Sequence, residues 1–237
     1  MLDIHNHILP GVDDGASSLE EALRMARQAA ANGITAIVCT PHMDTFGNPA
    51  VSLARHAVVR AALQERLDGE GIPLRLYGGA EWMVSEELVG VLHDLPEGRL
   101  ARSEAFLFEL SVFMPPDVIG RLLFAARLKG LTPLWAHPER HPAMPGHAEL
   151  AQPVVDAGGW LQLTSGSLTG VFGKDVRRCA ESLCTAFSGR VLLGSDAHDA
   201  ERRVAELQEG YAALNALSAG LGDKVREKTA PLLHVVI

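Results

Sequence analysis

The stretch Asp3-Ile4-His5-Asn6-His7 lies near the start of the chain, directly before Ile8-Leu9. Successive side chains of an extended strand point to opposite faces, so Asp3, His5 and His7 are expected on one side and Ile4 on the other. Two imidazoles two residues apart on a rigid strand are a ready pair of transition-metal ligands. Histidines that only hydrogen-bond in the core would show the same spacing, so the rest of the chain must decide between the two interpretations.

Short apolar runs follow the first strand and alternate with helical patterns. Continuous apolar runs of four to six residues are typical of strands buried on both faces. Residues 35–40, 74–77, 105–108, 132–136, 160–163 and 190–193 are predicted strands. Apolar residues at helical spacing, a capping box at Ser17-x-x-Glu20 and a stop at Asn32-Gly33 predict the first helix. Further helices are predicted at 49–67, 115–128, 147–157, 175–186, 200–217 and 223–228.

Roughly seven strand–helix repeats with short connections predict a parallel sheet in one α/β domain over residues 1–237, since no linker divides the chain. Polar clusters follow almost every predicted strand. Active sites of closed barrels lie at that end of the strands, which favours a TIM-like barrel. An open doubly wound sheet is the alternative, but it would gather polar residues only near its switch point.

The composition excludes several classes of function. The 237 residues carry a formal net charge of −8 and no basic run, so no nucleic-acid partner is predicted. No apolar run approaches the roughly 20 residues of a membrane span, and no secretory signal precedes the first strand. The three cysteines, Cys39, Cys179 and Cys184, lack the spacing of a disulfide framework, which favours a reducing cytoplasm. Nothing in the pattern predicts an oligomeric state.

Nine imidazole and carboxylate groups stand at or just after the predicted strand ends. They are His5, His7, Asp14, His42, Glu81, Glu109, His137, Asp196 and His198. Taken singly, a glutamate here could cap a helix and a histidine beside proline could belong to a turn. Together on one rim they would be costly without positive charge, and divalent cations are the natural compensation. Imidazoles and carboxylates without thiolates favour Mn, Fe or Zn, and nine ligands predict two or three ions.

The motifs around these residues resemble those of the PHP (polymerase and histidinol phosphatase) superfamily over essentially the whole chain. Within it, the chain is most similar to bacterial capsular-polysaccharide tyrosine phosphatases of the CpsB/YwqE type. The motifs are D-I-H-N-H-I-L-P-G-V-D-D-G at 3–15, T-P-H at 40–42, G-A-E at 79–81, F-E-L at 108–110, H-P-E-R at 137–140 and G-S-D-A-H at 194–198.

The resemblance implies a distorted (β/α)7 barrel, the PHP fold, with a three-metal site. One ion would be held by His5, His7, Glu81 and Asp196, a second by Glu81, Glu109 and His137, and a third by Asp14, His42 and His198. Manganese is the first candidate, with iron, zinc, magnesium or cobalt as alternatives. Many relatives have histidine where Asp14 stands, and the D-D-G version indicates the tyrosine-phosphatase branch.

The implied activity is hydrolysis of phosphotyrosine on a protein, with the tail of a capsule or exopolysaccharide tyrosine kinase as the expected partner. Cations about 3.5–4 Å apart would bind phosphoryl oxygens and lower the pKa of a bridging water, which attacks phosphorus as hydroxide. Arg140 and Arg203 are candidates for a guanidinium clamp on the phosphate, although Arg202 could replace its neighbour. His198 or a bound water could protonate the leaving group. A histidinol-phosphatase-like phosphomonoesterase and a metal-binding protein without turnover are the alternatives.

For three further features of the sequence, two interpretations remain open. Cys184 and Arg190 fit the C-x5-R pattern of thiol-based tyrosine phosphatases, but here a helix precedes the pattern and a strand follows it, so we expect a chance match. Asp3 either fixes a histidine tautomer or is a buried, hydrogen-bonded carboxylate. Residues 164–167, Thr-Ser-Gly-Ser, either line the pocket or form a turn.

Overall fold

The computed structural model describes residues 1–114 and 119–235, and nine strands lie within them. Each strand is short, and most strands are buried as the apolar runs predict, whereas β3 and β4 are partly exposed. The strands are β1 (Leu2–Asn6), β2 (Ala36–Cys39), β3 (His42–Met43), β4 (Arg75–Gly78), β5 (Glu81–Met83), β6 (Ala105–Glu109), β7 (Thr132–Ala136), β8 (Trp160–Thr164) and β9 (Val191–Gly194).

All strand pairs are parallel and fall into two sheets, with orders β1-β2-β4 and β3-β5-β6-β7-β8-β9. The chain enters the second sheet at His42, because Pro41 has no N–H with which to continue the ladder after β2. The chain returns to this sheet at Glu81, the first residue of β5, which pairs with His42 of β3. One bridge, between Asn6 and Ala197, links the end of β1 to the segment after β9.

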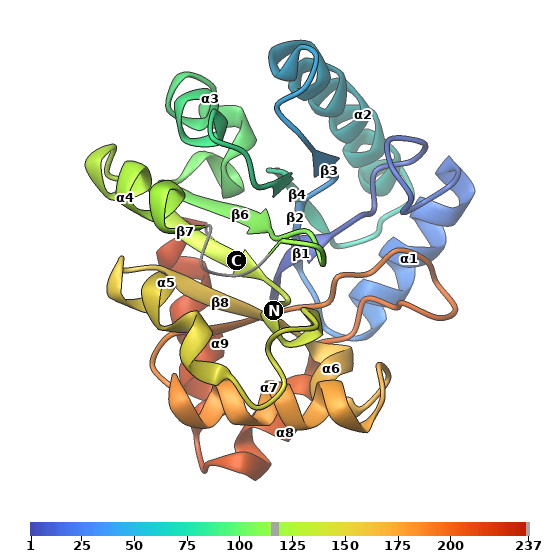
Figure 1. Cartoon of the computed structure of the whole chain (residues 1–237). Coiled ribbons are helices and arrows are strands. Elements are labelled where there is room, and N and C mark those ends of the chain that lie inside the picture. The colour runs from blue at the N-terminus through green and yellow to red at the C-terminus, as the bar shows by residue number, and fades with distance from the viewer. Residues whose placement is uncertain (115–118, 236–237) are drawn as a thin grey trace.

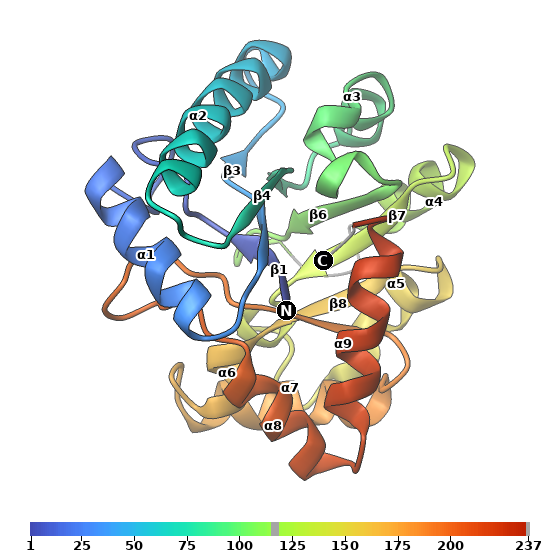
Figure 2. The same cartoon turned by 180° about the vertical axis from the view of Figure 1, so that it is seen from behind.

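The architecture is therefore a single α/β domain with parallel sheets. The strands stand at the centre of the molecule with helices around them (Figures 1 and 2). Within residues 1–114 and 119–235, the paired strands do not form a continuous closed ring, so the predicted closed barrel is not confirmed.

The helices lie on the outside of the strands (Figures 1 and 2). They are α1 (Leu19–Ala31), α2 (Pro49–Gly69), α3 (Leu88–Asp94), α4 (Gly120–Leu128), α5 (Gln152–Asp156), α6 (Ser165–Thr169), α7 (Lys174–Ala186), α8 (Gln208–Leu217) and α9 (Leu221–Leu232). Short 3-10 turns complete the chain: η1 (Pro96–Gly98), η2 (Leu100–Arg102), η4 (Pro138–Arg140) and η5 (Ala148–Ala151). No helix in the described part of the chain is long and apolar enough to cross a membrane.

Two helix predictions need correction at their ends, and part of a third cannot be compared. Ser18 rather than Ser17 caps α1, because its hydroxyl accepts from the N–H of Glu21. Residues 200–207 are not helical, since the Asp199 carboxylate accepts the N–H groups of residues 201–203 and closes a loop instead. Arg203 accordingly lies in this loop. The predicted helix start at 115–118 lies outside the described residues.

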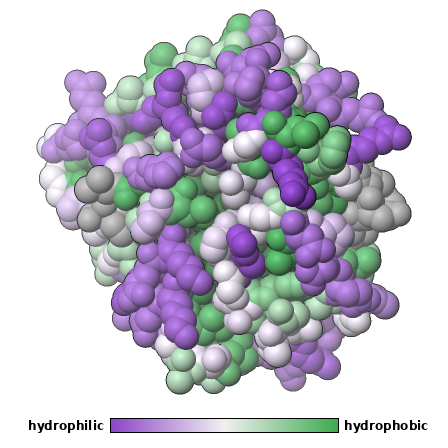
Figure 3. All heavy atoms as spheres, turned by 90° about the vertical axis from the view of Figure 1, so that its left-hand side faces the viewer, coloured by the Kyte–Doolittle hydropathy of each residue, from purple (hydrophilic) through white to green (hydrophobic). Residues whose placement is uncertain are grey.

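Two apolar clusters fill the molecule. The larger packs the outer faces of the strands against the helices and includes Leu161 and Leu163 of β8. The smaller lies on the inner faces of the strands and includes Ile4, Leu134 and Leu192. The surface is mostly polar on the face drawn in Figure 3, with apolar patches between the polar residues. The inner cluster closes one end of the strands and leaves the other end to polar residues.

Candidate metal centre

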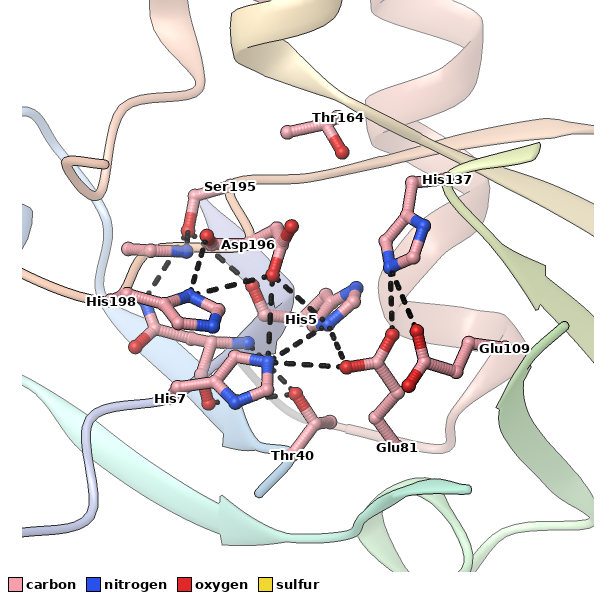
Figure 4. Close-up of polar contacts among 12 residues, drawn as sticks. His5, His7, Thr40, Glu81, Glu109, His137, Thr164, Ser195, Asp196 and His198 are labelled. Carbon is pink, nitrogen blue, oxygen red and sulfur yellow. Dashed lines mark hydrogen bonds and ion pairs between the residues drawn. The ribbon is translucent and has the colours of Figure 1, made fainter. Parts of the chain in front are cut away.

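The nine candidate ligands gather around the ends of β1, β6, β7 and β9 and the starts of β3 and β5, and we call them the histidine–carboxylate cluster. His5 lies in β1, and His7 follows it directly; His42, Glu81 and Glu109 lie in β3, β5 and β6. The remaining four are on loops: Asp14 after β1, His137 after β7, and Asp196 and His198 after β9. Figure 4 shows how His5, His7, Asp196 and Glu81 point toward one another. The residues that we selected from the sequence therefore lie close together in the folded protein.

Four of these residues form the tightest group and are fully or almost fully buried. His5 Nε2 lies 3.1 Å from His7 Nε2, 3.1 Å from Glu81 Oε2 and 3.3 Å from Asp196 Oδ1. His7 Nε2 lies 3.3 Å and 3.4 Å from the same two oxygens. Four ligand atoms at about 2.0–2.1 Å from a shared tetrahedral ion are about 3.3–3.4 Å apart. The spacing of this group therefore suits one cation.

In each of the two carboxylates, one oxygen faces only imidazole nitrogens of the cluster. Glu81 Oε2 and Asp196 Oδ1 are buried and have no hydrogen-bond partner among the described residues. Burial would raise the pKa of Glu81, but the positive charge of His5 and a hydrogen bond from His137 hold it well below its ordinary value. Burial acts on Asp196 in the same way, but His5, His7, His137 and Arg140 together outweigh it and hold the pKa of Asp196 well below its ordinary value. Ionised, unpartnered oxygens at this spacing fit a divalent cation.

A second group shares Glu81. Its ligand atoms belong to His42, Glu81 and Glu109, all within 4.8 Å of one another. His42 Nδ1 lies 3.2 Å from Glu81 Oε2 and 3.6 Å from Glu109 Oε1. His137, expected here from the resemblance, places its Nε2 2.8 Å from Glu81 Oε1 and 3.9 Å from Glu109 Oε2. The structure thus adds His42 to the neighbours of Glu81, which belongs to both groups.

The third group consists of His7, Asp14, His42 and His198. Asp14 Oδ1 lies 3.4 Å from Nε2 of both His42 and His198. Burial, together with the neighbouring His7, lowers the pKa of His198 to about 4, so this imidazole is neutral near pH 7. A neutral ring is the form that binds a metal.

Outer hydrogen bonds orient the imidazoles. The Nδ1–H of His5 donates to Gln162 Oε1 over 2.7 Å, and that of His7 donates to Asp13 Oδ2 over 2.7 Å. The Nδ1–H of His198 donates to the backbone oxygen of Asp196 over 3.1 Å. In each ring Nε2 is left to face the cluster, which is how metal-binding histidines are held.

Sequence analysis did not single out Asp13 or Gln162. Asp13 stands in the quoted D-D-G motif, and Gln162 is a lone polar residue inside the apolar run of β8. A buried amide in such a run is the signal that could have identified it. Asp3, which we considered for this role, contacts no imidazole among the described residues; it accepts from the N–H of Ser195 and from Asn6 Nδ2, each at 2.9 Å. The second interpretation of Asp3, a buried and hydrogen-bonded carboxylate, describes the structure.

Two arginines reach the cluster from the other side of Asp196. Arg140 Nη1 donates to Asp196 Oδ2 over 2.6 Å, and Arg203 Nη2 donates to the same oxygen over 2.5 Å. Both guanidinium groups are about a quarter to a third exposed, at 25% and 30%. The neighbouring Arg202 is exposed, and its side chain has no hydrogen-bond partner in the described part of the chain. Arg203 is therefore the residue of this pair that faces the site.

The backbone is unusual at two positions of the cluster. His137 has a φ of 35° and Asp196 a φ of 53°, both in the left-handed region that side chains seldom adopt. Each residue follows a strand and turns its side chain toward the cluster. Backbone strain of this kind is concentrated at functional sites.

The alternative thiol site is wrong. Cys184 lies inside α7 with its side chain buried, and burial raises the pKa of its thiol to about 12. Arg190 lies over the ring of Trp160 and donates to the backbone oxygen of Gly158, away from the cysteine. A reactive cysteine has a lowered pKa, for example at a helix N-terminus, whereas Cys184 lies within a helix and its pKa is raised.

Fold and site together define a parallel α/β protein whose strand ends gather a histidine–carboxylate cluster. The model of the CpsB/CapC family, described as capsular polysaccharide synthesis, matches residues 1–228, and the chain belongs to this family.

Two relatives and one solved structure extend the comparison. Tyrosine-protein phosphatase YwqE of Bacillus subtilis (strain 168) is 36% identical over 222 residues, covering 88% of this chain and 82% of the relative. Tyrosine-protein phosphatase CpsB of Streptococcus agalactiae is 30% identical over 169 residues, covering 70% and 68%. The fold also matches a chain from the crystal structures of YwqE from Bacillus subtilis and CpsB from Streptococcus pneumoniae, which are described as unique metal-dependent tyrosine phosphatases. The TM-score is 0.88 at 32% sequence identity, and the match covers 100% of this chain and 96% of the other.

Proposed function

We propose that this protein is a metal-dependent tyrosine-protein phosphatase. The observation that carries the proposal is the buried group of His5, His7, Glu81 and Asp196, in which Glu81 Oε2 and Asp196 Oδ1 have no hydrogen-bond partner among the described residues. Arg140 and Arg203 hold the other oxygen of Asp196, Oδ2. Similarity to proteins named tyrosine-protein phosphatases over most of the chain supports the same activity.

Two or three divalent cations would be held by the nine residues of the cluster, with manganese as the first candidate. His5, His7, Glu81 and Asp196 would hold one; Glu81, Glu109, His42 and His137 surround the place of a second; the third group is His7, Asp14, His42 and His198. Cations in this position would supply positive charge to a phosphoryl group and would lower the pKa of water.

In this proposal Arg140 and Arg203 both hold Asp196 and bind the substrate phosphate. Each uses one Nη to hold Oδ2 of Asp196, which leaves Oδ1 for the cluster. The exposed parts of Arg140 and Arg203 keep further N–H donors for the substrate. A planar guanidinium can bind two phosphate oxygens at once, and charge on those oxygens is what the transition state of phosphoryl transfer must have stabilised.

The leaving group favours tyrosine over alkyl phosphates. A phenol has a pKa of about 10, so its phenolate needs less help from an acid than an alkoxide does. The neutral His198 at the site could serve as a proton relay only after gaining a proton, which its low pKa opposes. Because a phenolate is only weakly basic, it can leave with little protonation by His198.

The description of the family as capsular polysaccharide synthesis supports a substrate in capsule assembly, and we propose the tyrosine-rich tail of a capsule kinase. We also propose that the two sheets act as one distorted (β/α)7 barrel. The Asn6–Ala197 bridge and the run of β3 directly after β2 support this view.

The test is a side-by-side assay of a phosphotyrosine peptide and histidinol phosphate with added manganese. Turnover of the peptide is expected to exceed that of histidinol phosphate. Asp196→Asn should abolish it, because the negative charge is lost and one of the two oxygens becomes an N–H donor. A preference for histidinol phosphate would replace the proposal by a small-molecule phosphatase. Metal binding with no turnover of either compound would support a regulatory protein instead.

A further inference from the structure

Thr164 stands at the carboxyl end of β8 and has a buried hydroxyl that is not used. Its side chain is 1% exposed, and Oγ1 has no hydrogen-bond partner among the residues that the structure describes. We propose that this hydroxyl is a substrate-binding group that donates a hydrogen bond to a phosphoryl oxygen. The inference rests on the proposed function and adds a residue to its site.

Strand geometry directs Thr164 toward the cluster. Side chains alternate along β8: Leu161 and Leu163 pack outward, while Trp160 contacts the inner apolar cluster and Gln162 bonds His5. Thr164 continues the inward series, one layer beyond Gln162. Figure 4 shows it above Asp196 and His137, with its hydroxyl oxygen on the side nearer His137.

The backbone of Thr164 is held firmly while its hydroxyl is left free. Glu139 Oε1 accepts the N–H of Thr164 over 2.9 Å and the hydroxyl of Ser167 over 2.7 Å. Glu139 precedes Arg140, so the same short turn positions both the arginine and the threonine. In β9, Gly194 pairs with Thr164, two residues before Asp196.

A free hydroxyl is not a general property of this site. Thr40 is equally buried at the end of β2, yet its Oγ1 accepts the N–H of Asn6 over 2.9 Å. Buried polar atoms in folded proteins nearly always have partners, so an exception in a binding site indicates a ligand or a water that supplies one. Arg203 Nε is a second buried donor without a partner in the described chain, and it belongs to the same site.

The experiment compares Thr164→Val and Thr164→Ser with Thr229→Val. Valine keeps the shape of threonine without the hydroxyl. Thr229 is a matched control, since it is 2% exposed but donates to the backbone oxygen of Val225 in α9 over 2.8 Å. Each variant is measured for phosphotyrosine-peptide kinetics, inhibition by inorganic phosphate, metal content and thermal unfolding.

For Thr164→Val we expect kcat/KM to fall about 10- to 100-fold and inhibition by phosphate to weaken about tenfold, the size of one hydrogen bond to a charged group. Metal content should not change, and the melting temperature should stay the same or rise, because an unsatisfied hydroxyl is removed. Thr164→Ser should restore the kinetics. Thr229→Val should lower the melting temperature and leave the kinetics unchanged.

A Thr164→Val protein with a lower melting temperature and normal kinetics and phosphate inhibition would overturn the inference, because its hydroxyl would then serve folding alone. Loss of metal from this variant would also overturn it. If the wild-type protein does not hydrolyse the peptide, the proposed function fails. Thr164 can then still be tested by measuring how tightly the metal-loaded wild-type and Thr164→Val proteins bind inorganic phosphate.

Discussion

His5 donates its Nδ1–H to Gln162 Oε1 across 2.7 Å, in a pair whose members are 157 residues apart in the chain. The amide cannot be reversed, because Gln162 Nε2 donates to the backbone oxygen of Leu163 over 2.8 Å. This pair fixes the tautomer of His5 and leaves Nε2 to face the cluster. An acceptor behind a metal-binding histidine also raises the basicity of the ring.

Gln162→Leu should therefore weaken metal binding about 10- to 100-fold, the usual effect of losing such a partner. The measurement is a metal titration of the stripped protein, followed by calorimetry. Gln152→Leu is the control, because Gln152 bonds only the exposed Asp156 within the described chain. Equal metal affinities of the two variants would contradict the role assigned to Gln162.

Arg203 and Arg202 are adjacent but should differ in their effect. Arg203→Ala removes a donor to Asp196 and one arm of the phosphate clamp, so we expect kcat/KM to fall about 100-fold or more. Arg202→Ala should change it less than about threefold, as expected of an exposed side chain. Arg203→Lys keeps the charge but not the planar fork and should remain impaired. Peptide kinetics at constant metal content measure all three; a larger loss for Arg202→Ala would reverse the assignment.

Gly194→Ala should disturb the site through its closest neighbours. An added Cβ would lie 2.8 Å from His5 Cβ and 2.9 Å from Gln162 Nε2, so both residues of the orienting pair must move. We expect a loss of about 1–3 kcal/mol in the free energy of unfolding, as for other overpacked positions, together with weaker metal binding. Chemical denaturation and metal titration test this. Gly189→Ala, where a Cβ meets nothing within 4 Å, is the control and should be nearly neutral.

Cys184→Ala should leave kcat/KM within about twofold, since the thiol is buried in α7 and burial raises its pKa to about 12. The stability of the protein should fall slightly, because a small cavity is created. Loss of turnover with full metal content would bring back a cysteine mechanism.

Much of the fold and the site could be predicted from the sequence because the apolar runs are short and each ends in polar residues. His5 and Asp196 were identified from such positions, and the structure places their ligand atoms 3.3 Å apart. Partners such as Gln162 were missed, because their role depends on which strands are neighbours in space. Helical periodicity also extended wrongly across 200–207, where the Asp199 side chain forms local hydrogen bonds that pattern alone does not show.

The seam between β1 and the segment after β9 has a consequence for biosynthesis. Asp3 joins Ser195, and Asn6 bridges to Ala197, across about 190 positions of sequence. At a translation rate of about 5–20 residues per second, roughly 10–40 s pass between the appearance of the first histidines and of their last carboxylate partner. A nascent chain consequently cannot complete the cluster before residues 196–198 have emerged from the ribosome.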